Sequence, residues 1–353
     1  MRKVIHIYKT YKPFTHGGVE TYIDSILSYQ GSKFEHTLLS IGNINHTNKK
    51  KKIFKKSFSI NSDVISFQLF FYLYKNIDRK NVILHLHTPW PSMELFLNFA
   101  GFENIVLTYH SDIVRQKLSN YFYKKINISL LKKNRIKKII STSNIYYKTS
   151  KILKHIPRSK IKTIPIGIDN LSIPSKIPTN KKLKYILFIG SNRSYKGISL
   201  LERLIKKGNF TIIIIGSNLK KFKQYKNVNV YENIADIDKE KLISNAYLLL
   251  MTSISRNEAF GIVLVEALRS GVPLISPNIN SGVSWINKHN ETGFQYRTGN
   301  FDDMLEKIHK LMRIDKKSYN QMCKNAHARY EKYFKLNIMI KKIEDVYSSV
   351  SNS

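Results

Sequence analysis

The sequence predicts an α/β protein made of two doubly wound domains. Short β-branched runs alternate with longer helical patterns, which is typical of parallel strands whose sheets carry helices on both faces. The chain has 353 residues, more than one core of ordinary size holds. A polar stretch with prolines at 174 and 178 separates the two halves. Ligands of such sheets bind beyond the carboxyl ends of the strands.

The two halves are expected at 1–168 and 184–334, and the last stretch, Leu336–Ser349, is expected to form a helix. Strands of the first half are predicted at Val4–Tyr8, Val82–His87, Ile105–Tyr109, Lys138–Thr142 and Ile161–Pro165, with a helix at Glu20–Tyr29. Strands of the second half are predicted at Tyr185–Ile189, Phe210–Ile215, Val228–Tyr231, Tyr247–Met251 and Pro273–Ser276. Its helices are predicted at Ile198–Lys206, Lys239–Asn245 and Met304–Met312.

The composition is strongly basic, with 59 Lys and Arg residues against 24 Asp and Glu and a formal charge of +35. Such an excess indicates partners rather than a fold. The basic segments 49–56 and 121–138, the second of which mixes aromatic residues with cations, suit the headgroups of an anionic membrane. A nucleic-acid surface or a solvated face would have a similar composition, although no nucleic-acid recognition motif accompanies the charge.

The sequence favours a cytoplasmic protein that at most lies on a membrane surface. Its single cysteine, Cys323, excludes an internal disulfide and fits a reduced compartment. The first residues lack a secretory apolar region, and no apolar run approaches the roughly 20 residues that span a bilayer.

The segment 257–267 is the most informative motif. Glu258 is expected at the end of a loop, just before a helix, and Glu266 about two turns into that helix. The free N–H groups of Phe260 and Gly261 would attract negative charge at the start of the helix. The arrangement suits a ligand that is anionic at one end and rich in hydroxyls at the other, such as a nucleotide-activated sugar. An amphipathic helix with one capping and one solvated glutamate has the same spacing.

A second motif follows the first strand of the second half. Arg193 and Lys196 lie in a strand-to-helix loop, where they could neutralise a diphosphate leaving group. In so basic a chain, two solvated surface residues are the alternative.

Three further features lie in the first half. Gly17 and Gly18 start a helix and would let backbone approach a ligand, although a simple turn explains them as well. His110 follows a strand end, where it either lines the ligand site or belongs to a polar loop that caps the next helix. His85 and His87 share one face of a strand, a spacing that can bind metal. No third ligand lies near these two histidines in sequence, so we predict no metal site.

The order of residues from Asn257 to Ala267, continued by the segments 270–273, 281–285 and 291–293, resembles the retaining family-4 glycosyltransferases of the GT-B fold. The resemblance covers nearly the whole chain and is closest to the mannosyltransferase-like subgroup of bacterial polysaccharide enzymes. It implies that Glu258 contacts hydroxyls of the donor sugar and that Glu266 holds the ribose. It also places Ala259, Phe260 and Gly261 in the donor site.

The resemblance extends to the other motifs. It implies that Arg193 and Lys196 bind the diphosphate, although many family members carry the arginine directly after the strand, where this chain has Ser191 and Asn192. It implies that His110, within a His-Ser-Asp-Ile-Val motif, contacts the transferred sugar. It places Gly17 and Gly18 close to the donor phosphates and the acceptor.

The function implied is a retaining hexosyltransferase without cofactor or metal. It would move a sugar from GDP-mannose or a UDP-hexose to a lipid-linked glycan for O-antigen or capsule, at the inner face of the plasma membrane. In the GT-B arrangement, residues 1–168 would bind the acceptor, with a helix at about 335–350 packing back on them, and residues 184–334 would bind the nucleotide sugar. The alternatives are a nucleotide-sugar epimerase of the same fold, or a non-enzymatic basic protein that binds nucleic acid or membrane. With the leading function, no nucleic-acid partner is expected.

Overall fold

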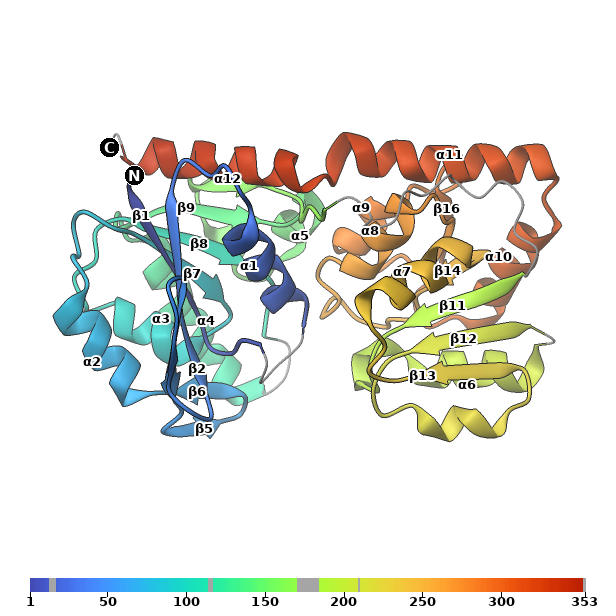
Figure 1. The fold of residues 1–353 in the computed structure, drawn as a ribbon, viewed down its shortest axis with the longest axis horizontal. Coiled ribbons are helices and arrows are strands. Elements are labelled where there is room, and N and C mark those ends of the chain that lie inside the picture. Colours follow the sequence, from blue (N-terminus) through green and yellow to red (C-terminus); the bar gives the residue numbers. More distant parts are fainter. Residues whose placement is uncertain (13–16, 114–116, 170–183, 209, 352–353) are drawn as a thin grey trace. The chain divides into compact units, whose positions relative to one another are not determined.

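The computed structural model describes residues 1–12, 17–113, 117–169, 184–208 and 210–351 (Figure 1). The chain divides into two compact units, which we call the first and the second unit. The first consists of Met1–Ile166 with Leu336–Ser353, and the second of Gly167–Lys335. Most of the predicted linker, residues 170–183, lies outside the described residues.

The first unit contains an eight-stranded sheet in the order β10-β9-β8-β7-β1-β2-β4-β3. Its strands are parallel except for the pair β3–β4. The strands are β1 (Lys3–Tyr8), β2 (Glu35–Gly42), β3 (His46–Thr47), β4 (Lys51–Lys55), β7 (Ile83–Thr88), β8 (Ile105–Tyr109), β9 (Ile136–Ser141) and β10 (Ile161–Thr163). Strands β2, β3 and β4 were not predicted from the sequence, whereas the other strands lie within two residues of their predicted bounds.

Helices flank this sheet, and a short hairpin adds a second small sheet. The helices are α1 (Gly18–Ser28), α2 (Phe67–Asn76), α3 (Pro91–Leu97), α4 (Lys117–Lys132), α5 (Asn144–Thr149) and α12 (Leu336–Ser351); the hairpin is β5 (Phe58–Ile60) with β6 (Asp63–Ile65). Helix α12 packs on the first unit through Tyr347, which is fully buried.

The second unit contains six parallel strands in the order β13-β12-β11-β14-β15-β16. These are β11 (Tyr185–Ile189), β12 (Thr211–Ile215), β13 (Val228–Tyr231), β14 (Leu248–Leu250), β15 (Leu274–Pro277) and β16 (Gly293–Tyr296). Its helices are α6 (Ile198–Lys207), α7 (Asp236–Asn245), α8 (Ile262–Arg269), α9 (Gly282–Ile286), α10 (Phe301–Arg313) and α11 (Lys316–Tyr333). The prediction of two parallel, doubly wound α/β sheets is confirmed.

Each sheet reverses its strand order at one point. From β1 the chain moves to β2 on one side and later to β7 on the other, and from β11 it moves to β12 and later to β14. The connections on either side of such a point diverge, which is why ligands of open α/β sheets bind beyond the carboxyl ends of these strands. We therefore expect ligand-binding residues in the loops after β1, β7 and β8 in the first unit and after β11 and β14 in the second.

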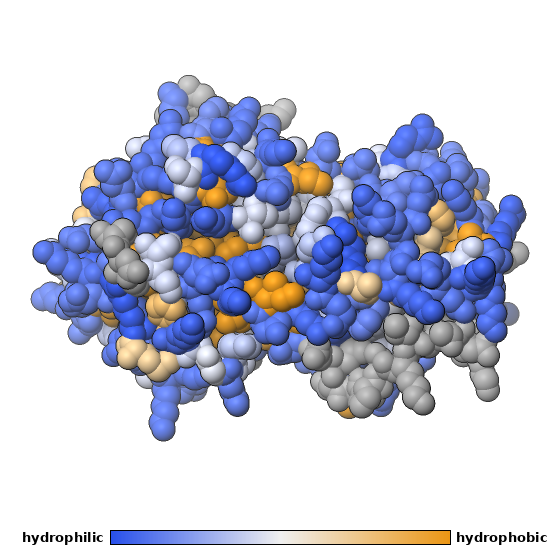
Figure 2. Space-filling model, turned by 90° about the horizontal axis from the view of Figure 1, so that it is seen from above, coloured by the Kyte–Doolittle hydropathy of each residue, from blue (hydrophilic) through white to orange (hydrophobic). Residues whose placement is uncertain are grey.

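The surface seen in Figure 2 is mostly hydrophilic, with separate smaller apolar areas. Within the described residues, no helix combines the length and the hydropathy needed to cross a membrane.

Candidate active site

The loop after β11 packs directly on the loop after β14. Thr252 donates its hydroxyl to the carbonyl oxygen of Lys196 at 2.6 Å. Gly197 has a φ of +63°, and a Cβ atom there would lie 1.9 Å from the carbonyl oxygen of Thr252. Only glycine tolerates both the left-handed backbone and this close approach. Gly197 thus allows the Arg193–Lys196 loop to pack closely against the loop after β14.

This packing brings Lys196 and Glu258 into contact. Lys196 Nζ lies 2.5 Å from Glu258 Oε2, and the two side chains are only 14% and 12% exposed. Ser253 donates a second hydrogen bond to the same carboxylate oxygen at 3.2 Å. Ser281 donates to the carbonyl oxygen of Glu258 at 2.7 Å and anchors the backbone. A cation and a carboxylate therefore lie side by side at the point where the strand order of the second unit reverses.

Helix α8 begins directly after this pair. Its N-cap is Gly261, which has no side chain to cap the helix, so the first backbone N–H groups are available to an anionic ligand. Phe260, just before the cap, is buried. Helix α8 starts at Ile262, and Glu266 is its fifth residue, so Glu266 lies just over one turn into the helix instead of the two turns predicted.

Glu266 has a partner that the sequence analysis missed. Lys239, on α7, donates to Glu266 Oε1 at 2.8 Å and lies 2.8 Å from Oε2 as well. One ammonium group thus hydrogen-bonds Oε1 and lies within ion-pair distance of Oε2, a buried oxygen that has no hydrogen-bond partner among the described residues. Arg193, by contrast, is exposed, and its guanidinium forms no ion pair with any residue that the structure describes.

In the first unit, Gly17 is the N-cap of α1, and Gly18 is the first residue of the helix. The Glu20 side chain folds back over this helix start, so a Cβ atom on Gly17 would lie 2.7 Å from Glu20 Oε2. Thr10 donates a hydrogen bond to the other oxygen of this buried carboxylate at 2.8 Å. The group that closely approaches Gly17 is thus the chain's own carboxylate, and not a ligand. His16, beside this motif, lies outside the described residues.

His110 follows β8 and is 7% exposed. Its Nε2 lies 3.1 Å from Nδ1 of His87, and its ring makes an edge-to-face contact with that of Tyr22 at a centroid distance of 5.2 Å. Burial lowers the pKa of His110 to about 3, so the imidazole is neutral at physiological pH. Asp112 accepts hydrogen bonds from Tyr109 and Ser150. His110 therefore belongs to a histidine cluster at the ends of β7 and β8 and not to a capping loop.

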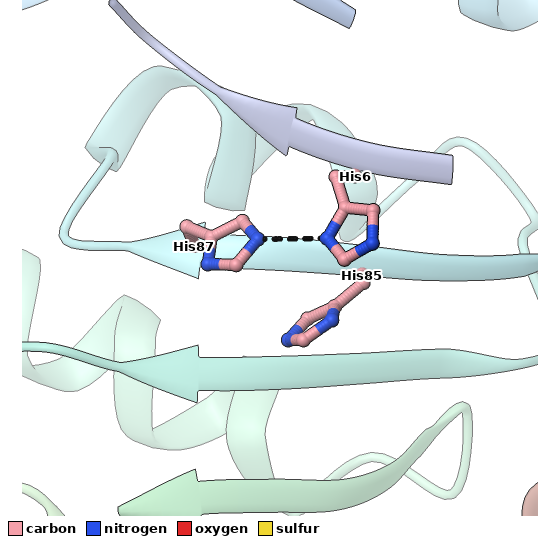
Figure 3. Close-up of side chains that lie close together, drawn as sticks. All are labelled: His6, His85 and His87. Atoms are coloured by element: carbon pink, nitrogen blue, oxygen red, sulfur yellow. Dashed lines mark hydrogen bonds between the residues drawn. The ribbon is translucent and has the colours of Figure 1, made fainter. Parts of the chain in front are cut away.

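The cluster contains more histidines than the sequence analysis found. His6, on β1, joins His85 and His87 on β7, and their ligand atoms lie within 4.8 Å of one another (Figure 3). His36, on β2, extends the group. Both added residues lie on strands that neighbour β7 or each other in the sheet, so only the strand order reveals the set.

The geometry of the cluster favours hydrogen bonding over metal binding. Zinc needs lone pairs that converge on one point about 2.0–2.1 Å away. His6 Nδ1 and His87 Nε2 instead form a hydrogen bond with each other at 3.1 Å. Both nitrogens of His85 are occupied, by Tyr347 at 2.6 Å and Thr108 at 2.7 Å. The rings of His85 and His87 are stacked, 4.5 Å apart at 25°, so their in-plane lone pairs run side by side.

Comparison with known proteins decides the family. The profile of the family described as Glycosyltransferase Family 4 matches residues 16–170, and that of Glycosyl transferases group 1 matches residues 169–329. The chain belongs to the group 1/family 4 glycosyltransferases. It is therefore a glycosyltransferase of the GT-B fold, retaining by its family, and this membership rules against the epimerase and the non-enzymatic alternatives.

Two curated relatives match over nearly their full length. A D-rhamnosyltransferase of Pseudomonas aeruginosa is 28% identical, covering 94% of this chain and 92% of the relative. The O-antigen chain mannosyltransferase C of Escherichia coli is 27% identical, covering 99% of both. Among solved structures, Anabaena HepE in complex with UDP-glucose is similar in fold, with a TM-score of 0.76 at 17% identity over 99% of this chain and 100% of that one. The chain is thus a glycosyltransferase that uses a nucleotide sugar and is related to enzymes of surface polysaccharide synthesis.

Proposed function

We propose that this glycosyltransferase moves a manno-configured hexose from a nucleotide diphosphate to a lipid-linked glycan during O-antigen or capsule synthesis. The names of the two full-length relatives support the sugar, because D-rhamnose is 6-deoxy-D-mannose. GDP-mannose is therefore the first donor to test. A UDP-hexose is the second, since the Anabaena structure holds UDP-glucose.

The observation that carries the proposal is the contact between Lys196 and Glu258. A nucleotide sugar is anionic at the diphosphate and rich in hydroxyls at the sugar, and this pair offers a cation and a hydroxyl acceptor next to each other. We assign Lys196, with the exposed Arg193, to the diphosphate, and Glu258 to the sugar hydroxyls. The backbone of 259–261 at the start of α8 would bind phosphate oxygen, and Glu266 would bind the ribose.

In the first unit we assign His110 to binding of the transferred sugar. We assign Gly17 and Gly18 to contact with the donor phosphates and the acceptor. During transfer the leaving diphosphate gains charge, and Arg193 and Lys196 would stabilise that charge more than they stabilise the ground state. The departing phosphate oxygen would accept the proton of the attacking acceptor hydroxyl. This front-face route keeps the configuration of the sugar, as the family does.

The test is transfer of labelled sugar to lipid. Purified protein is incubated with GDP-mannose or UDP-glucose, labelled in the sugar, and with a lipid extract from cells that lack this gene. Label in the organic phase, lost in the Lys196→Met variant, supports the assignment. Nucleoside diphosphate release that does not depend on the lipid extract contradicts the lipid-linked acceptor, and no release with either donor contradicts the donor assignment.

An anionic membrane surface is the second part of the proposal, and α2 supports it. Phe67, Phe71 and Tyr74 form one stripe on this helix and are 63%, 61% and 55% exposed. Leu69 and Leu73 are buried on the opposite side. A helix with this pattern suits the headgroup level of a bilayer.

Basic residues lie among these aromatic side chains. Lys75 Nζ lies 5.1 Å from the ring centroid of Phe71, and the Arg79 guanidinium lies 4.3 Å from that of Tyr74. The two basic segments identified in the sequence, 49–56 and 121–138, support a membrane-binding surface less than α2 does. In 49–56, Lys51 is paired with Asp24 at 3.2 Å. In 121–138, the side chains at 121–123 lie outside the described residues.

Cosedimentation with vesicles tests the membrane surface. We expect binding to vesicles of phosphatidylglycerol and phosphatidylcholine, and loss of that binding in the Phe67→Ser/Phe71→Ser variant. Tyr231→Ser, which removes a 39%-exposed aromatic residue from the second unit, is the control. Equal binding of the wild type and the double variant would contradict the assignment to α2.

A further inference from the structure

Four histidines form an unbroken chain of hydrogen bonds through the first unit. His110 Nε2 lies 3.1 Å from His87 Nδ1, His87 Nε2 lies 3.1 Å from His6 Nδ1, and His6 Nε2 lies 2.9 Å from His36 Nδ1. The four residues come from the end of β8 and from β7, β1 and β2, which are consecutive neighbours in the sheet. Each link joins Nε2 of one ring to Nδ1 of the next, so the chain has a direction.

The chain ends at a carboxylate. His36 Nε2 lies 2.9 Å from Ser32 Oγ, and Ser32 donates its hydroxyl to Glu344 Oε1 at 2.7 Å. The backbone N–H of Lys33 donates to the same oxygen at 2.9 Å, and that of Phe34 donates to Ser32 Oγ at 3.2 Å. Glu344 lies on α12, the last helix of the chain, which belongs to the first unit.

The carboxylate of Glu344 determines the position of every proton in this hydrogen-bond chain. An ionised carboxylate only accepts, so the single hydroxyl proton of Ser32 points to Glu344. Ser32 must therefore accept a hydrogen bond from Nε2–H of His36. A neutral imidazole has one donor and one acceptor, so Nδ1 of His36 accepts from His6, and the same step repeats to His87 and then to His110. All four rings carry their proton on Nε2.

These proton positions require neutral rings, and the environment of the rings keeps them neutral. Burial lowers the pKa of His36 to about 4 and that of His110 to about 3, and it holds the pKa values of His6 and His87 well below the usual range. For His6 and His87, a positive charge on a neighbouring ring would lower the pKa further, so protonation of one ring disfavours protonation of the next.

We infer that Glu344, acting through Ser32 and three buried histidines, fixes the tautomer of His110 and so leaves its Nδ1 as a hydrogen-bond acceptor at the carboxyl end of β8. Nδ1 of His110 makes no hydrogen bond to any residue that the structure describes, and the residue is 7% exposed. The group of a ligand that meets this atom must be a donor. We assign that group to a hydroxyl of the transferred sugar, and this assignment rests on the proposed function.

Glu344 is thus a positioning residue for His110, and nuclear magnetic resonance of the ring nitrogens tests this directly. The full chain is prepared with isotope-labelled histidine, without any sugar nucleotide, and the signals are assigned by single His→Gln substitutions. In the wild type at neutral pH, we expect the Nε2–H pattern for His6, His36, His87 and His110. An Nδ1–H pattern at any of the four would overturn the inference.

Two variants ask whether Glu344 is the cause. In Glu344→Lys the new side chain can only donate, so Ser32 would turn its proton to His36 and the chain would reverse, giving Nδ1–H at His110. In Ser32→Ala the anchor is lost, and we expect a mixture of both tautomers. Glu331→Gln, which removes a partly exposed carboxylate of the second unit, is the control and should change nothing. A His110 signal that stays as in the wild type in both variants contradicts the inference.

Activity provides an independent readout. If the donor assignment holds, kcat/KM for the sugar nucleotide falls about tenfold in Glu344→Lys, the size expected for one hydrogen bond. The tautomer measurement involves no substrate, so it can fail while turnover is normal, and the reverse is also true. Stoichiometric zinc that shifts the His6 and His87 signals would contradict the inference, because two atoms that both bind a metal cannot share a proton.

Discussion

Lys196 and Glu258, which lie 62 positions apart in the chain, form an ion pair of 2.5 Å at the carboxyl ends of two neighbouring strands. In the proposed reaction, the donor diphosphate must compete with Glu258 for the ammonium group. Lys196→Met should therefore lower kcat/KM by about two to three orders of magnitude, as loss of a group that stabilises developing charge does. Steady-state kinetics with GDP-mannose and UDP-glucose measure this, and an unchanged kcat/KM would exclude a role in phosphate binding.

The same pair makes a prediction about stability. Lys196→Met leaves a carboxylate that is 12% exposed without its cation, which should lower the free energy of unfolding by about 1–3 kcal/mol. In Lys196→Met/Glu258→Gln no unpaired charge remains, so part of the stability returns. Thermal unfolding of both single variants and the double variant measures the coupling, and strictly additive effects would count against a structural ion pair.

Gly197→Ala should destabilise the second unit, because the new Cβ would overlap the carbonyl oxygen of Thr252 in a left-handed backbone. We expect a loss of about 3 kcal/mol. Gly31→Ala is the matched control, since its φ is +88° but nothing lies within 4 Å of the added Cβ. That variant should lose only about 1 kcal/mol, the cost of the backbone conformation alone. Equal melting temperatures of the two variants would show that the contact with Thr252 does not matter.

Acid should destabilise the first unit through its histidines. Burial lowers the pKa of His36 to about 4 in the folded state, whereas in the unfolded chain it has the usual value of about 6.5. Between these values the unfolded state binds a proton that the folded state does not, so the free energy of unfolding falls as pH falls. Each such histidine contributes up to about 1.4 kcal/mol per pH unit.

Melting temperatures across this pH range test the prediction. The wild type should lose stability steadily below about pH 6.5, and His36→Gln should lose it less steeply, because one titrating group is absent. A melting temperature that is constant between about pH 7 and pH 5 would contradict the lowered pKa values.

Lys239 should position Glu266. Lys239→Met frees the carboxylate from an ammonium group that contacts both its oxygens. We expect it to weaken nucleotide binding less than Glu266→Ala does, since the ribose acceptor remains but is less well oriented. Calorimetric titration with GDP and UDP ranks the two variants, and a larger loss in Lys239→Met would mean that the lysine itself binds the nucleotide.

Much of the fold could be predicted from local sequence patterns. The runs that became β1, β7 and β11, and the Arg193–Lys196 loop, are readable because alternation and turn residues act over a few positions. The helix after Glu258 was predicted as well, although Glu266 lies just over one turn into it and not two.

Contacts between distant elements could not be predicted. His6 and His36 join His87 only because β1 lies between β2 and β7, and strand order is a property of the whole sheet. Lys239 is one of 59 basic residues, and nothing near it in sequence distinguishes it until α7 packs beside α8. Glu20 covers Gly17 through the geometry of a single helix turn, but the two glycines alone predicted an approaching ligand.

The most direct test of the central claim is the thermal stability of the purified protein with a panel of GDP- and UDP-sugars, repeated with Glu266→Ala. A ligand at 100 times its dissociation constant adds about 2.7 kcal/mol to the stability of the state that binds it. Our assignment predicts that one nucleotide class, with GDP-mannose foremost, stabilises the wild type and that the variant loses this response. Stabilisation by nucleic acid or anionic lipid, with no response to any sugar nucleotide, would contradict the assigned donor site.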